Sequence, residues 1–118
     1  MQLVDENPTK LRCADGEIIT VDVDANDGVA EVRYALDGNT WGGGSFTARR
    51  ANPPRPPDVP TMSLVVGVIY SGDSGGAATI TITGSNGGAT SVVQVTQAPT
   101  TEGLEEEASD IVNYRIYI

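Results

Sequence analysis

The chain has 118 residues, enough for one domain, and its 16 acidic and seven basic side chains give a formal net charge of −9. A surface of this charge repels polyanions, so we expect neither nucleic acid nor an anionic membrane as a partner. Aromatic residues make up only 5% of the chain, while 14 glycines and seven prolines supply turns between segments rich in valine, isoleucine and threonine. This composition favours a β-sandwich or a β-barrel.

The N-terminal half predicts several short strands. Residues 11–14 predict the first, in which Cys13, the single cysteine, is expected to be a small buried side chain outside any internal disulfide. Apolar and polar side chains then alternate over residues 17–25 and again over residues 29–36, as in strands with one buried face. The sequence Asp37-Gly38-Asn39 predicts a hairpin turn at the end of the second of these strands.

A proline-rich segment interrupts the second half of the chain. Residues 45–49 predict a further short strand, but residues 51–60 cannot join a central ladder, because proline lacks the N–H donor. We expect a long loop with polyproline II character there. Strand patterns resume in four segments, at residues 62–70, 77–83, 89–97 and 111–118. No apolar run approaches the length of a membrane span.

Two stretches of the chain resemble known families. One stretch is similar to the early strands of bacterial immunoglobulin-like modules. It consists of the segments Ile-Thr-Val-Asp-Val-Asp at 19–24 and Gly-Val-Ala-Glu-Val-Arg-Tyr at 28–34, followed by Leu-Asp-Gly and Trp41. Residues 74–83 and 93–98 resemble the closing strands of BACON domains, a carbohydrate-binding family. Both resemblances imply an immunoglobulin-like sandwich, and the second implies glycan binding.

These observations together predict the fold class and the division of the chain. We expect an all-β protein: an immunoglobulin-like antiparallel β-sandwich of about seven strands with an extra C-terminal strand. The sandwich would cover residues 1–99, an acidic linker residues 100–110, and the C-terminal strand residues 111–118. That last strand must be paired, because an exposed strand of this kind is an aggregation hazard. It pairs either with its own sheet or with the sheet of a neighbouring subunit by strand addition.

Residues that carry common enzyme chemistry are missing from the sequence. It contains no histidine, which removes the most frequent general base and metal ligand, and one cysteine is too few for a structural zinc site. No P-loop or dinucleotide-binding fingerprint occurs, and no pair of carboxylates has an evident substrate cleft. We therefore predict that the protein is not an enzyme and needs no cofactor.

One acidic segment is a weak candidate for a calcium site. Its oxygen-bearing residues alternate as at the start of an EF-hand loop, and they are Asp22, Asp24, Asn26 and Asp27. The match fails because Asp27 stands where that loop needs glycine and Arg33 where it needs a bidentate acid. The alternative is a solvent-facing strand that runs into an Asx turn.

Three further groups of side chains are candidate binding residues. An aromatic platform for sugar stacking would consist of Trp41, Tyr34 and Tyr70, with packing of Trp41 in the core or hairpin as the alternative. A basic patch near the proline-rich loop would consist of Arg49, Arg50 and Arg55, with a merely solvated loop as the alternative. The apolar face of the C-terminal strand would meet a partner through Val112, Tyr114, Ile116 and Ile118.

The function expected from this sequence is structural and non-catalytic. We predict an accessory protein of a phage virion, such as a capsid decoration, head-fibre or tail component, that acts by protein–protein assembly. Its partners would be further copies in a homo-oligomer or the capsid or tail proteins of a larger assembly. Residues 1–10 have no signal-peptide pattern, so we expect synthesis in the cytoplasm and a final place on the virion surface or outside the cell. The alternative is a carbohydrate-binding or adhesion module.

Overall fold

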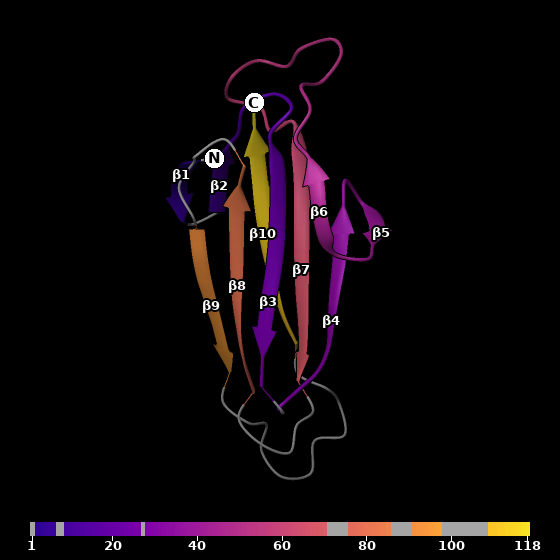
Figure 1. The fold of residues 1–118 in the computed structure, drawn as a ribbon, viewed down its shortest axis with the longest axis vertical. Coiled ribbons are helices and arrows are strands. Elements are labelled where there is room, and N and C mark those ends of the chain that lie inside the picture. Colours follow the sequence, from indigo (N-terminus) through magenta and orange to yellow (C-terminus); the bar gives the residue numbers. More distant parts are fainter. Residues whose placement is uncertain (1, 7–8, 27, 71–75, 86–90, 98–108) are drawn as a thin grey trace.

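The computed structural model describes residues 2–6, 9–26, 28–70, 76–85, 91–97 and 109–118. These residues form ten β-strands and no helix, and the strands build two sheets that pack face to face (Figure 1). The prediction of an all-β sandwich is confirmed at this level. The number of strands is larger than the expected seven with one extra, in part because Gln2–Glu6 adds a strand that the sequence pattern did not indicate.

The larger sheet has six strands in the order β1-β2-β10-β7-β4-β5. Its strands are β1 (Gln2–Glu6), β2 (Thr9–Arg12), β4 (Val29–Leu36), β5 (Asn39–Trp41), β7 (Met62–Tyr70) and β10 (Ser109–Tyr117). Neighbours pair antiparallel, with the exception of β2 and β10, which run parallel. The turn between β4 and β5 has positive φ at both Asp37 (51°) and Gly38 (80°), as a type I′ hairpin requires.

The smaller sheet has four antiparallel strands in the order β6-β3-β8-β9. Its strands are β3 (Ile18–Ala25), β6 (Gly44–Thr47), β8 (Gly76–Gly84) and β9 (Ser91–Gln97). Every strand predicted from residue 17 onward has a counterpart, and the predicted bounds of β4 and β7 agree with the structure. The proline-rich residues 51–60 form a loop without strand or helix, as their composition predicted.

The core lies between the two sheets and follows the alternation of the strands. On β7 the inward side chains are buried, and they are Leu64, Val66, Val68 and Tyr70. Ile80 and Ile82 of β8 face them from the smaller sheet with no exposed surface. Since each fully buried aliphatic side chain contributes about 1.5–3 kcal/mol relative to an exposed one, this layer is the main source of stability.

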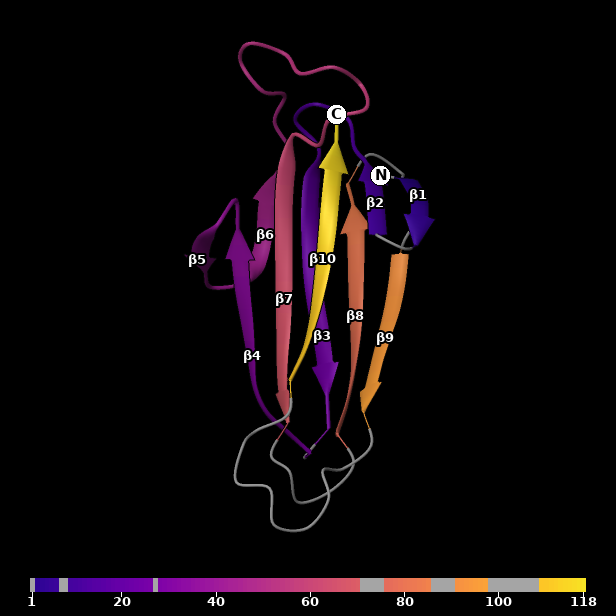
Figure 2. The ribbon, with the colours of Figure 1, turned by 180° about the vertical axis from the view of Figure 1, so that it is seen from behind.

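The C-terminal strand belongs to the sheet of its own chain. β10 lies between β2 and β7, and Figure 2 shows it running beside β7 over most of its length. Of the two alternatives left open by the sequence, the structure therefore has the first. The strand begins at Ser109, so the last two residues of the expected linker 100–110 are part of β10, and residues 100–108 lie outside the described residues.

Candidate functional site

A hollow of about 660 Å³ opens along β4, against β5, β7 and β10 of the larger sheet. It is lined by Glu31, Val32, Arg33, Tyr34, Ala35, Thr40, Trp41, Gly42, Val65, Gly67, Ile69 and Ile111. On the side of the sheet that faces away from the core, its apolar lining consists of Ala35, Val65, Gly67, Ile69 and Ile111, while Val32, Tyr34 and Trp41 of the lining pack against the core. The hollow therefore offers packing area more than a cluster of reactive groups.

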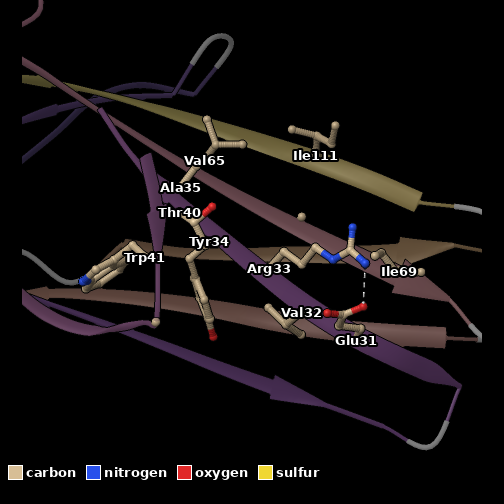
Figure 3. A pocket seen from close by; sticks show the side chains of 12 residues that line it. Glu31, Val32, Arg33, Tyr34, Ala35, Thr40, Trp41, Val65, Ile69 and Ile111 are labelled. Carbon is tan, nitrogen blue, oxygen red and sulfur yellow. Dashed lines mark hydrogen bonds and ion pairs between the residues drawn. The ribbon is translucent and has the colours of Figure 1, made fainter. Parts of the chain in front are cut away.

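The alternation of β7 explains why apolar groups gather on this outer face. While its even-numbered residues fill the core, Val65, Gly67 and Ile69 point outward. Ile111 of β10 lies directly beside Gly67 and is 72% exposed, the largest exposure among the exposed apolar side chains of the described residues. Figure 3 shows Val65 and Ile111 on one side of the sheet, while Tyr34 points away from them.

Glycine at position 67 deepens the hollow. A Cβ placed on Gly67 would have one neighbour within 4 Å, the backbone oxygen of Arg33 at 3.9 Å. The missing side chain thus leaves open space between Arg33 on β4 and Ile111 on β10, which flank Gly67 in the ladder. Glycine weakens a strand interior, so its presence at the centre of a nine-residue strand is typical of a site where another group approaches closely.

An exposed ion pair forms the polar rim of the hollow. Arg33 Nη2 donates to Glu31 Oε2 at 3.0 Å, and Figure 3 shows this bond on the outer side of β4. The hydrogen bond from Arg33 lowers the pKa of the Glu31 carboxyl, which favours the carboxylate form. Because the pair is solvated, its contribution to stability within one chain is small.

Two of the three aromatic candidates lie together, and they pack against the core. Trp41 is half-buried and makes edge-to-face contacts with Tyr34, at a centroid distance of 5.8 Å, and with Phe46, at 5.5 Å. Burial, and then the charge of Asp22, raise the pKa of Tyr34. Tyr70 is buried at the far end of β7, opposite Val29, and does not join them. The structure thus forms no platform of three exposed rings.

The weak calcium candidate occupies the end of β3. Asp22 and Asp24 point to solvent, and Asn26 forms an Asx turn in which its Oδ1 accepts the N–H of Gly28 at 3.0 Å and that of Ala77 at 3.1 Å. The side-chain oxygen expected to bind a cation instead holds β3 to β8. Asp27 lies outside the described residues, and within them no group of three or more acidic, cysteine or histidine side chains could hold a metal ion.

The three arginines of the expected basic patch lie between β6 and β7 and are exposed. The backbone N–H of Arg50 donates to Asp15 Oδ1 at 2.8 Å, which fixes the chain after β6. Arg55 Nη1 donates to the carbonyl oxygen of Pro60 at 2.7 Å, so this guanidinium braces its own loop. The side chain of Arg49 is exposed to solvent.

The apolar face expected to meet a partner on the C-terminal strand faces the core. Tyr114 and Ile116 have no exposed surface, and Val112 and Ile118 pack against the core cluster. The outward face of β10 instead carries Ile111, Asn113 and Arg115. Sequence reasoning missed Ile111 and Gly67 as surface features. The alternation of the C-terminal strand places Ile111 on the side away from its apolar face. That Ile111 lies beside Gly67 follows only from the pairing of β10 with β7.

No helix long and apolar enough to cross a membrane occurs in the part of the chain that the structure describes. Comparisons with protein-family models, curated proteins and solved structures give no significant match to this chain.

Proposed function

We propose that the protein is a non-catalytic interaction module that assembles with other protein subunits, and that it is an accessory component of a phage virion. Capsid decoration, head-fibre and tail positions all fit such a module. It needs no cofactor, and its place is the virion surface or the outside of the cell after synthesis in the cytoplasm.

The observation that carries this proposal is the apolar outer face of the larger sheet. Ile111 is 72% exposed beside the open space over Gly67, and Val65 and Ile69 extend the same apolar surface. In soluble proteins a contiguous apolar surface rimmed by charges marks a site of contact with another protein. The ion pair of Glu31 and Arg33 at the rim favours one orientation of the bound partner.

The test is the association of the chain with particles. Phage virions whose genome encodes the chain would be purified on a density gradient. Quantitative mass spectrometry would then measure the number of copies of the chain per virion. A fixed copy number supports the proposal, and absence from the particles contradicts it. Ile111→Asp should abolish association, while Ile18→Asp, at an isoleucine 49% exposed on the smaller sheet, should leave it intact.

A carbohydrate-binding or adhesion module is the second candidate, and the aromatic residues of the same hollow favour it. Trp41, Tyr34 and Thr40 line one end of the hollow, where a ring edge and a hydroxyl could meet a sugar. A glycan array with wild type and Trp41→Phe tests this function, because phenylalanine keeps an aromatic contact with Phe46. Saturable binding that Trp41→Phe weakens would support the module.

The finer fold assignment belongs to the same proposal. An immunoglobulin-like sandwich related to bacterial immunoglobulin-like and BACON modules is supported by two largely antiparallel sheets over one core, with successive strands crossing between the sheets. An experimental structure tests it through the connections. Two packed sheets in which the chain follows the immunoglobulin strand order would support the assignment, and a single sheet closed into a barrel would contradict it.

A further inference from the structure

We infer that the outer face of the larger sheet is a self-complementary interface, at which two copies of this chain pack face to face. Ile69 of each copy fills the space over Gly67 of the other, and Glu31 of each copy lies beside Arg33 of the other. This inference rests on the proposed function, since it names the partner that the apolar face takes.

The registers of the ladder place the four residues in two adjacent rows. In one row Glu31 of β4 lies beside Ile69 of β7, and in the next row Arg33 lies beside Gly67. Residues two apart on a strand share a face, so both rows point outward. One row thus offers a large side chain and a negative charge, and its neighbour offers a space and a positive charge.

A two-fold axis that crosses the strands between these rows exchanges them. The large side chain of one copy then meets the space of the other, and each acid meets a base, as an isologous interface requires. Ile111, which continues the row of Arg33 and Gly67 onto β10, lies over Ser109 of the other copy in this arrangement. Each half of the interface supplies what the opposite half lacks.

Charge favours a second copy at this face over the outer face of the smaller sheet. With a net charge of −9, two copies repel each other on average. On the outer face of the larger sheet, however, Glu31 is balanced by Arg33, and Arg115 is a further exposed base. The outer face of the smaller sheet carries Asp22 and Asp24 instead. Repulsion between copies is therefore weaker at the apolar outer face of the larger sheet than at the outer face of the smaller sheet.

The first part of the test fills the space over Gly67. Sedimentation velocity over a concentration series should show a reversible dimer for the wild type. Gly67→Val should raise the dimer Kd by about tenfold or more, because the new side chain occupies the place of the partner's Ile69. The variant should still fold, since a Cβ at this position meets one atom at 3.9 Å and valine suits a strand. Circular dichroism verifies the fold.

The second part exchanges the charges. Arg33→Glu should weaken the dimer by a similar factor, and the double variant Glu31→Arg with Arg33→Glu should restore it, because each acid again faces a base. Arg49→Glu changes the net charge by the same amount at an exposed arginine in the loop after β6 and should leave the dimer Kd close to that of the wild type. Failure of the double variant to restore association would overturn the inference.

The outcome also separates this inference from the proposed function. A wild-type chain that stays monomeric at every concentration, yet associates with particles through Ile111, overturns the self-complementary interface and leaves the proposed function standing. A dimer that both Gly67→Val and Arg33→Glu disrupt supports the interface even if no particle carries the protein. A dimer that neither variant changes uses another surface and overturns the inference.

Discussion

Asp37 and Ser63 bind each other through two hydrogen bonds that fix the β4–β5 turn to the start of β7. The backbone N–H of Asp37 donates to the carbonyl oxygen of Ser63 at 2.8 Å, and Asp37 Oδ1 accepts the N–H of Ser63 at 2.9 Å. Asp37 adopts a φ of 51°, in the left-handed region that aspartate and asparagine tolerate better than other residues with a Cβ. The turn conformation and the hydrogen bond to β7 therefore both favour aspartate at position 37.

Asp37→Ala is expected to lower the free energy of unfolding by about 1–2 kcal/mol, because the N–H of Ser63 loses its acceptor and alanine is strained at this φ. Asp37→Asn keeps an acceptor oxygen and tolerates the left-handed region, so it should cost less than half as much. Urea denaturation of the three proteins measures both values. Equal losses for alanine and asparagine would contradict this account, because a neutral acceptor for the Ser63 N–H and tolerance of this φ would then contribute nothing.

Glu17 is completely buried although its side chain is ionisable. Its Oε1 accepts the N–H of Ala14 at 3.0 Å, and its backbone bonds to Ala14 and Ala48 connect the start of β3 with the end of β6. We expect Glu17→Ala to lower the free energy of unfolding by about 2 kcal/mol, since the N–H of Ala14 loses its acceptor and the buried Glu17 side chain leaves a cavity. Glu17→Gln retains an acceptor oxygen and should cost less. If glutamine proved as damaging as alanine in urea denaturation, the negative charge itself would be the stabilising feature.

Tyr114 carries a hydroxyl that finds no hydrogen-bond partner among the described residues. The side chain has no exposed surface, and burial raises the pKa of this phenol. An unsatisfied buried hydroxyl costs about 1–3 kcal/mol, so Tyr114→Phe should raise the free energy of unfolding by about 1 kcal/mol. Thermal unfolding followed by calorimetry checks the sign. A lower melting temperature for the phenylalanine variant would mean that the hydroxyl is bonded after all.

The strands could be predicted from the sequence because their pattern is local. Alternation gave the bounds of β4 and β7 and the side of β10 that faces the core, since side-chain direction depends only on position along a strand. The partner of β10 could not be predicted in this way. Pairing with β2 and β7 joins residues at least 40 positions apart, and period alone carries no information on such neighbours.

The candidate site was predicted less well, for two physical reasons. The hollow depends on Gly67 lying between Arg33 and Ile111, three residues from three strands whose order is a tertiary property. Trp41 was considered as a sugar-stacking residue, with core packing as the alternative, and its contacts with Tyr34 and Phe46 agree with the alternative. An aromatic residue after a turn has the same sequence signature in both situations.

Cys13 gives the protein a pH dependence at alkaline pH that one substitution can isolate. The side chain is buried after β2, where its backbone N–H donates to the carbonyl oxygen of Tyr117 at 2.8 Å. Burial, and then the negative charge of Glu17, raise the pKa of the thiol to about 11, from 9.0 in an exposed cysteine. At neutral pH Cys13 is therefore a protonated thiol and should react slowly with thiol reagents in the folded state.

The direction of the effect follows from the protonation states. Between pH 9 and 11 the unfolded chain loses the thiol proton while the folded chain keeps it, so the free energy of unfolding falls as pH rises through this window. The loss approaches about 2–3 kcal/mol at its upper end. In Cys13→Ala this contribution is absent, and tyrosine and lysine titrations cancel in the comparison of the two proteins. Urea denaturation from pH 8 to 11 gives the free energy of unfolding of each protein, and the values for wild type and Cys13→Ala should converge as pH rises. A constant difference between the two proteins would mean that the Cys13 thiol is in contact with water.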